Sequence, residues 1–183
     1  MKLISHRGNI KGPNPYKENA PTYIDCAIGN GYDVEIDVRS IDGELWLGHD
    51  EPQYKIEHKW LEERKKYLWI HCKNLKAAKE CIIYNSFIHH SDEPYAYTTN
   101  GKIWLHDLTM EIDNNVIVPI FVSNDHVECE HLIEDQKFDS LSNEDTIIIP
   151  RWLHPYAICT DWPVSIVRAC LLYTSDAADD VNG

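Results

Sequence analysis

Residues Gly31 to Pro52 read GYDVEIDVRSIDGELWLGHDEP. The first half of this stretch alternates polar and apolar residues with the period of two that is typical of a β-strand. We therefore expect Glu35, Asp37 and Arg39 to lie on one face of the strand, and the apolar residues between them to lie on the other. The two carboxylates then face the same small volume.

A tight turn is predicted at Asp42-Gly43, because glycine tolerates the positive φ that a two-residue hairpin requires. With the turn centred there, Asp37 lies opposite Gly48, and His49 comes within reach of the carboxylates. We expect Gly48 to leave open space beside Asp37. Two carboxylates and a histidine are suited to metal binding and to acid–base chemistry. A hairpin with one solvated face is the alternative that this stretch alone leaves open.

Further short motifs flank this hairpin in a definite order. The set is H-R-G at His6–Gly8, E-N at Glu18–Asn19, E-I-D at Glu35–Asp37, D-G at Asp42–Gly43 and H-D at His49–Asp50. This set resembles the glycerophosphodiester phosphodiesterases of the phosphatidylinositol-phospholipase-C-like barrel superfamily. The similarity is strong in the first third of the chain and faint between Ser86 and His154. A weaker match to the family's last strand, A-I-C-T-D-W-P, lies at Ala157–Pro163.

The resemblance implies an α/β fold, a (β/α)8 TIM barrel. Such barrels usually need about 250 residues, whereas this chain has 183. We therefore expect a compact barrel with shortened or missing helices in its second half. A strand at Lys2–Ser5 and a helix at Ala20–Asn30, capped by Asn19, precede the central strand, and this order is typical of parallel α/β architecture.

Later elements are predicted from apolar runs and turn signals. Helices are expected at Ile56–Tyr67, Leu75–Tyr84 and Asp125–Phe138, and strands at Leu68–Lys73, Phe87–His90, Tyr95–Thr98, Ile103–His106, Val116–Val122 and Thr146–Ile149. The spacing from Tyr95 to Val122 is short for strand–helix units, so at least one crossover there is expected to be a loop. His89, His90 and His106 end predicted strands. For each of them a position at the rim or surface is favoured over one that lines the pocket.

One domain is expected over residues 1–169, since this length suits a single core. Residues 170–183 begin CLLYTSDAADD, which resembles one reading frame of a transposon-derived sequencing adapter. The segment carries no clear periodicity. We therefore expect a non-native or disordered tail after Ala169.

Composition narrows the choice of partner. Hydrophobic residues make up 43% and charged residues 26% of the chain, as in ordinary globular domains. The net charge of −13 argues against nucleic acid or an anionic membrane as a partner. No run of 18 apolar residues occurs, so no membrane insertion is expected. The expected partner is a small-molecule phosphodiester held by a few cations or a metal; the oligomeric state is left open.

The six cysteines show no C-x-x-C pair and no zinc-type spacing. They lie in apolar runs, so we interpret them as buried free thiols in a reducing compartment. His6 and Arg7 interrupt the N-terminal segment before an apolar signal-peptide core can form. A cytoplasmic location is therefore expected.

The strand at Leu68–Lys73 places Trp69, His71 and Lys73 on one face. The family carries E-x-K at this place, whereas this chain has His71-Cys72-Lys73. The resemblance implies that Glu35 and Asp37 bind one divalent cation, with His71 in the position of the third ligand. Imidazole nitrogen favours Mn²⁺ over the harder Mg²⁺ and Ca²⁺. A purely hydrogen-bonded, structural His71 remains the alternative.

The resemblance implies metal-dependent hydrolysis of glycerophosphodiesters to glycerol phosphate and an alcohol, a reaction of lipid metabolism. His6 and His49 are expected to act as base and acid on opposite sides of phosphorus. Arg7 and Lys73 are the expected catalytic cations that also contact the phosphate. The attacking group, either water or the neighbouring glycerol hydroxyl, is left open.

Substrate binding is expected to involve Arg7 and Lys73 together with Glu18 and Asn19, which position the first loop and a substrate hydroxyl. Two alternatives stand beside this prediction. In one, the exchange of glutamate for His71 leaves a catalytically impaired barrel that only binds phosphodiesters. In the other, the enzyme is metal-independent, and Arg7 and Lys73 supply the positive charge. Sensitivity to a chelator separates the last possibility from the first.

Overall fold

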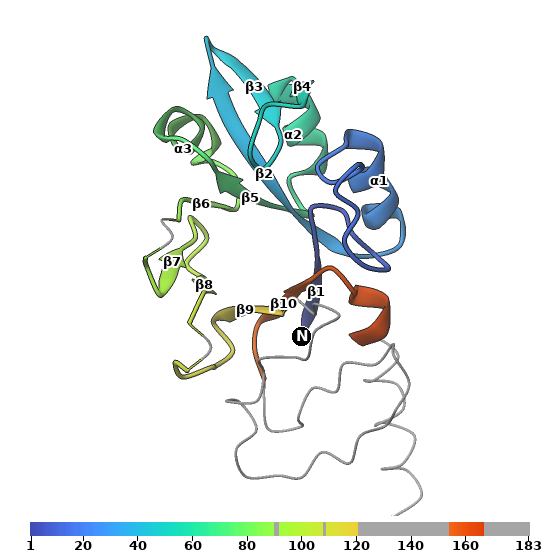
Figure 1. Ribbon diagram of the computed structural model, residues 1–183. Helices are drawn as coiled ribbons and strands as arrows, with labels where there is room; N and C mark the ends of the chain where they lie inside the picture. The colour runs from blue at the N-terminus through green and yellow to red at the C-terminus, as the bar shows by residue number, and fades with distance from the viewer. Residues whose placement is uncertain (90–91, 108, 121–153, 167–183) are drawn as a thin grey trace, which may run out of the picture.

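The computed structural model describes residues 1–89, 92–107, 109–120 and 154–166 (Figure 1). The strands in these residues are β1 (Lys2–His6), β2 (Asp33–Ile41), β3 (Glu44–Leu47), β4 (Tyr54–Ile56), β5 (Leu68–Cys72), β6 (Ser86–Phe87), β7 (Tyr95–Tyr97), β8 (Ile103–Leu105), β9 (Val116–Ile120) and β10 (Ala157–Thr160). The helices are α1 (Pro21–Gly29), α2 (His58–Arg64) and α3 (Leu75–Cys81), and a helical turn begins at Pro163.

All ten strands belong to one curled, mixed sheet (Figure 1). Parallel pairs join the strands in the order β6-β5-β2-β1-β10-β9-β8. Antiparallel pairs add β3 and β4 beyond the end of β2, and β7 beside β8. The long strand β2 therefore contacts three neighbours: β1, β5 and β3.

The predicted (β/α)8 TIM barrel is wrong. The described residues form a strand-rich half-barrel, and only short helices accompany it. The physical reason lies in the connections after β6. A parallel crossover needs a dozen or more residues, but β7 and β8 are joined by a tight turn at Thr98–Gly101 and pair antiparallel. Residues 88–94, between β6 and β7, are likewise too few for a crossover helix.

The central strand has the alternation that the sequence predicts. Val34, Ile36 and Val38 are fully buried in an apolar cluster that also includes residues of α1, α2 and α3. Burying a side chain of this size contributes about 1.5–3 kcal/mol. Glu35 and Asp37 point to the opposite face, and the turn at Asp42-Gly43 pairs Ile41 with Glu44 as expected. The hairpin prediction is therefore confirmed.

A second apolar cluster supports the polar residues on that opposite face. It includes Ile4, Trp69, Phe87, Trp104 and Cys159. Ile4, Trp69 and Cys159 each precede a polar residue by two positions, namely His6, His71 and Asp161. Residues two apart share a face of a strand, so the cluster forms an apolar floor under the polar groups.

Helix α1 begins differently from the prediction. Its N-cap is Ala20, with no side-chain hydrogen bond to the first turn. Asn19 instead adopts a left-handed φ of 62°, and its side chain binds Asp37. A capping residue keeps an extended backbone and faces its own helix, so the predicted capping role of Asn19 is wrong.

Several expectations fall outside the described residues. These are the helix Asp125–Phe138, the strand Thr146–Ile149, His90, the domain boundary at Ala169 and the tail of residues 170–183. Among the described cysteines, Cys72, Cys81 and Cys159 are buried free thiols as expected, whereas Cys26 is exposed. In the part of the chain that the structure describes, no helix has the length and apolar character needed to cross a membrane.

Candidate active site

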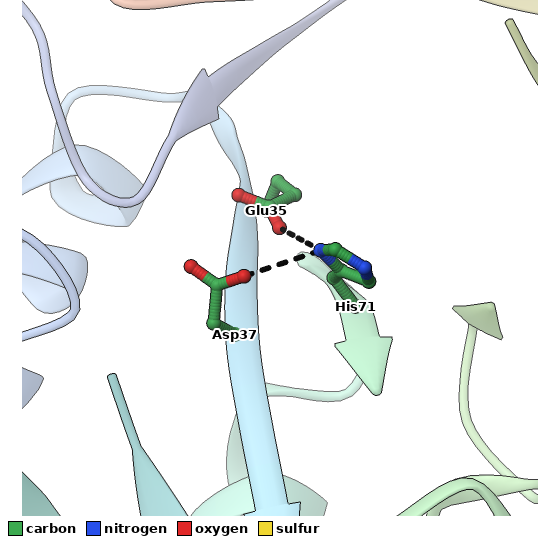
Figure 2. Close-up of side chains that lie close together, drawn as sticks. All are labelled: Glu35, Asp37 and His71. Carbon is green, nitrogen blue, oxygen red and sulfur yellow. Dashed lines mark ion pairs between the residues drawn. The ribbon is translucent and has the colours of Figure 1, made fainter. Parts of the chain in front are cut away.

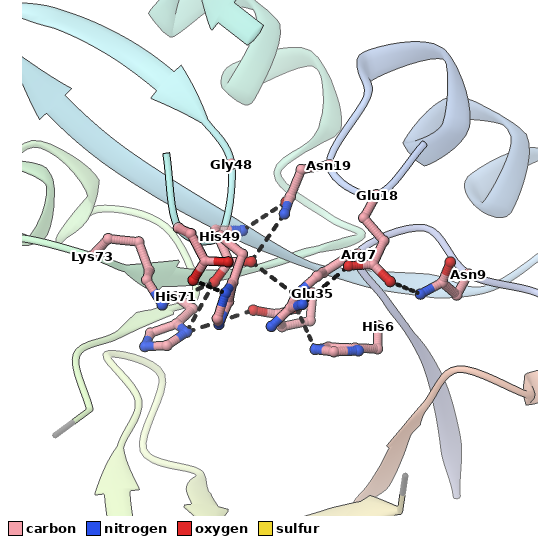
Figure 3. Close-up of polar contacts among 12 residues, drawn as sticks. His6, Arg7, Asn9, Glu18, Asn19, Glu35, Gly48, His49, His71 and Lys73 are labelled. Atoms are coloured by element: carbon pink, nitrogen blue, oxygen red, sulfur yellow. Dashed lines mark hydrogen bonds and ion pairs between the residues drawn. The ribbon is translucent and has the colours of Figure 1, made fainter. Parts of the chain in front are cut away.

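The candidate site residues lie side by side on three neighbouring parallel strands, β1, β2 and β5. In the strand register, His6 of β1 lies opposite Glu35 of β2, and Asp37 of β2 lies opposite His71 of β5. Side chains from sequence positions far apart therefore face one another (Figure 3). The structure thus brings together the histidine, the carboxylates and the strand β5 residue that the sequence singles out.

Glu35, Asp37 and His71 form a compact group of potential metal ligands (Figure 2). One ligand atom from each lies within 4.8 Å of the others. His71 Nδ1 is 3.2 Å from Asp37 Oδ1 and 3.9 Å from Glu35 Oε1. Only 3% of the Glu35 side chain and none of the Asp37 side chain is exposed.

Glu35 Oε2 accepts no hydrogen bond from the described residues. Asp37 Oδ1 faces His71 Nδ1 at 3.2 Å and Lys73 Nζ at 3.5 Å, and it accepts no well-aligned hydrogen bond from the described residues. Buried polar atoms without a partner are rare, because they lose the hydrogen bonds that water supplied. A divalent cation would satisfy such oxygens. The donor set of two carboxylates and one imidazole therefore fits a cation site.

Asp37 is approached by three further groups. Arg7 Nε lies 3.0 Å from Asp37 Oδ2, and Lys73 Nζ lies 3.5 Å from Asp37 Oδ1. The Asn19 amide donates to Asp37 Oδ2 at 2.9 Å, and the Asp37 N–H donates back to the Asn19 side-chain oxygen. The two cations predicted to contact phosphate thus stand beside the carboxylates.

The two carboxylates differ in acidity. Burial, together with the neighbouring charge of Asp37, raises the pKa of Glu35 to about 7. Burial alone would also raise the pKa of Asp37, but its contact with His71 and the charge of Arg7 outweigh burial and hold that pKa below its usual range. Without a bound ion, the site therefore favours one ionised carboxylate, that of Asp37.

Asp161, directly after β10, holds His6. Its Oδ1 is 2.8 Å from His6 Nδ1, while His6 Nε2 lies 3.9 Å from Glu35 Oε2. Burial lowers the pKa of His6, but the contact with Asp161 and the charge of Glu35 more than offset it, so this pKa is raised. An imidazole held at Nδ1 by a carboxylate has its Nε2 directed toward the site.

The side chain of Asn9 connects the two halves of this network. The buried Asn9 amide donates to Asp161 Oδ1 at 2.7 Å and to Glu18 Oε1 at 2.9 Å. Glu18 in turn accepts from Arg7 Nη1 at 3.0 Å. Glu18, predicted to bind substrate, therefore orients the arginine. Sequence reasoning assigned no role to Asn9 or Asp161; the T-D-W-P similarity after β10 was the available signal for Asp161.

His49 is placed next to the cluster by a backbone hydrogen bond of the residue before it. The Gly48 N–H donates to the Asp37 carbonyl at 3.2 Å, which places the following residue beside the carboxylates (Figure 3). The His49 ring is 40% exposed, and its Nδ1 is 2.7 Å from Asp50 Oδ1. The prediction that Gly48 leaves open space beside Asp37 is wrong. A side chain at this position is excluded by the loop itself, because a Cβ would lie 2.1 Å from the Glu51 carbonyl oxygen.

Two more histidines extend the site along the rim. The rings of His89 and His106 are stacked with centroids 3.3 Å apart, and His89 lies 6.4 Å from the ring of His71. Partial burial and the nearby His89 and His71 lower the pKa of His106 to about 4. The interpretation of His89 and His106 as rim residues agrees with this position.

Comparisons of the chain with protein-family models, with curated proteins and with solved structures give no match. The resemblance to glycerophosphodiester phosphodiesterases therefore stays a prediction from the motifs. The site itself combines a donor set that fits a divalent cation, two side-chain cations, Arg7 and Lys73, beside that set, and a histidine, His6, held by Asp161.

Proposed function

We propose that this chain is a metal-dependent phosphodiesterase that hydrolyses glycerophosphodiesters to glycerol phosphate and an alcohol. One observation carries the proposal: two buried carboxylates, Glu35 and Asp37, lie together with His71 on one face of the sheet, beside a histidine held by Asp161. A cation-binding pair beside a positioned imidazole suits displacement at phosphorus. The substrate class comes from the order of motifs between residues 6 and 50.

Glu35, Asp37 and His71 would hold the cation, with Mn²⁺ favoured over Mg²⁺ and Ca²⁺ because of the imidazole ligand. When bound, the cation polarises a phosphate oxygen and stabilises the charge that grows there. Arg7 and Lys73, which already flank Asp37, donate to the remaining phosphate oxygens. Asn19 keeps Asp37 in place by the paired hydrogen bonds between them.

His6 acts as the base and His49 as the acid. Asp161 fixes the orientation of the His6 ring and, by raising its pKa, makes the ring a stronger base. His6 Nε2 accepts the proton of the attacking hydroxyl, which belongs to water or to the neighbouring glycerol oxygen. His49 gives a proton to the departing alkoxide, so that a neutral alcohol leaves.

The test is the release of glycerol 3-phosphate from glycerophosphocholine by the purified chain. We expect turnover with Mn²⁺, loss of turnover on adding a chelator, and recovery on restoring the ion. Glu35→Gln removes one ligand charge at nearly constant shape and should abolish the response to metal. A wild-type chain that releases no product from any glycerophosphodiester with any divalent ion would contradict the proposal.

A metal-independent phosphodiesterase is the second candidate, and the contacts of Asp37 favour it. Arg7 Nε and Lys73 Nζ lie 3.0 and 3.5 Å from this carboxylate, and these two cations can also supply the positive charge that a phosphate needs. This candidate predicts turnover that a chelator leaves unchanged. In either form, the proposal includes a small-molecule substrate, a single domain over residues 1–169 and the cytoplasmic location that the cysteine pattern favours.

A further inference from the structure

Arg39 holds the loop that carries His49. Arg39 follows Asp37 by two residues on β2 and points to the same face. Its Nη1 donates to the Asp50 carbonyl at 2.6 Å, and its Nη2 donates to the carbonyls of His49 at 2.6 Å and Gly48 at 3.2 Å. One guanidinium therefore binds three successive backbone carbonyls.

The loop between β3 and β4 is tightly folded around this contact. Gly48 has a φ of +142°, and the position of its absent Cβ is 2.1 Å from the Glu51 carbonyl oxygen. The Gln53 N–H closes the loop on the Leu47 carbonyl at 2.8 Å. Three carbonyl dipoles that converge on one point repel one another unless a cation lies between them. The guanidinium is that cation.

We propose that Arg39 is a positioning residue for His49, holding the loop so that the imidazole stands over the substrate phosphate. This inference rests on the proposed function, in which His49 protonates the leaving alcohol. The contact reaches the ring as well as the backbone, because Asp50, whose carbonyl Arg39 binds, contacts His49 Nδ1 at 2.7 Å. A displacement of about 1 Å in a catalytic group can cost about 10²-fold in rate.

Lysine cannot replace this arginine fully. A guanidinium is planar and carries five donors in a fixed fork, whereas an ammonium group is a compact charge on a flexible stem. Arg39→Lys therefore keeps the charge but not the three-carbonyl contact. Arg64 on α2 offers a matched control, since it also pairs through two nitrogens, with Asp25 at 2.6 and 2.9 Å, away from the candidate site.

The leaving group distinguishes positioning of an acid from general damage. Glycerophosphocholine releases an alkoxide, which needs a proton, whereas the matched p-nitrophenyl ester of glycerol phosphate releases a stable phenolate, which does not. We expect Arg39→Lys and Arg39→Ala to lower kcat on glycerophosphocholine about 10²-fold and to leave kcat on the p-nitrophenyl ester within a few-fold of wild type. Arg64→Ala should leave both unchanged. Equal losses on both esters would overturn the inference.

Hydrogen exchange provides a measurement that does not depend on activity. In Arg39→Ala and Arg39→Lys, amide exchange should rise in residues 48–53, while β2 and β5 keep wild-type protection. Unchanged exchange in this loop would overturn the inference even if activity fell. If the wild-type chain turns over neither ester, the proposed function fails, and the exchange result still decides whether Arg39 holds the loop.

Discussion

The Asn19 N–H donates to the Arg7 carbonyl at 3.0 Å, and both residues have left-handed backbones, with φ of 62° and 51°. Such conformations cost non-glycine residues about 1–3 kcal/mol each and cluster at functional sites. Both side chains here turn to the same atom, Asp37 Oδ2, at 2.9 and 3.0 Å. The strained first loop therefore serves to aim an amide and a guanidinium at one buried carboxylate.

The two candidate catalytic histidines should act as a unit. His6→Ala and His49→Ala are each expected to lower kcat about 10²–10⁴-fold, because each removes one proton transfer from the same transition state. The double variant should lose much less than the product of the single losses. Steady-state kinetics on glycerophosphocholine measures all three. Near-full activity in either single variant would show that its assigned role is wrong.

The metal preference should depend on His71. We expect Mn²⁺ to bind more tightly than Ca²⁺, because an imidazole ligand favours the transition ion and brings no negative charge. His71→Glu should tighten Ca²⁺ binding, so that the difference in affinity between Mn²⁺ and Ca²⁺ becomes smaller or changes sign. Titration calorimetry of wild type, His71→Glu and His71→Ala with both ions measures the effect. Identical metal constants in all three proteins would exclude His71 as a ligand.

Replacing Glu35 should stabilise the metal-free protein at neutral and higher pH. The folded pKa of Glu35 is raised to about 7, whereas an unfolded glutamate keeps its ordinary pKa of 4.5. The folded state thus binds the extra proton between these values, and wild-type stability falls as pH rises through this window. Glu35→Gln has no ionisable group at this position, so it does not lose this stability as pH rises. Its melting temperature in chelator should exceed that of wild type increasingly between pH 4.5 and 7.

The outcome that would contradict the Glu35 prediction is a difference in melting temperature that stays constant with pH. Added Mn²⁺ supplies an internal control, because an ion held by the ionised carboxylates should stabilise wild type more than Glu35→Gln.

Asp161 should control the protonation of His6. The Asp161 charge helps to raise the pKa of His6 above 6.5. The pairing of protonated His6 with Asp161 therefore stabilises the fold fully below pH 6.5, and this stabilisation is lost as pH rises through the pKa of His6 in the folded state. Asp161→Asn should lower the His6 pKa, and its stability deficit should shrink as pH rises. Histidine NMR titration of the metal-free protein measures the pKa. A His6 pKa equal to that of wild type would refute the coupling.

Local patterns predicted the local parts of this structure well. The alternation from Val34 to Val38 and the turn at Asp42-Gly43 are set by residues a few positions apart, so side-chain period and turn chemistry suffice to specify them. The same holds for the pairing of Asp37 with Gly48. The convergence of Glu35, Asp37 and His71 then follows from parallel pairing of neighbouring strands.

The sequence did not predict the contacts that depend on distant segments. Barrel closure was inferred from resemblance, but it depends on connections with room for crossover helices, and residues 88–94 do not provide that room. Asparagine is a residue type that commonly caps helices, but the side chain of Asn19 binds Asp37 instead, and its backbone is left-handed and not the extended one that a cap requires. Gly48 was assigned to open space, whereas the nearby Glu51 carbonyl explains it.

The separation of His6 and Asp161 by 155 positions has a consequence for biosynthesis. A ribosome adds about 5–20 residues per second, so the 90 positions from His71 to Asp161 take about 5–18 s. All three candidate ligands are made before that interval, and the partner of His6 only after it. The three candidate ligand residues of the nascent chain are therefore in place before the carboxylate that holds His6 has been made.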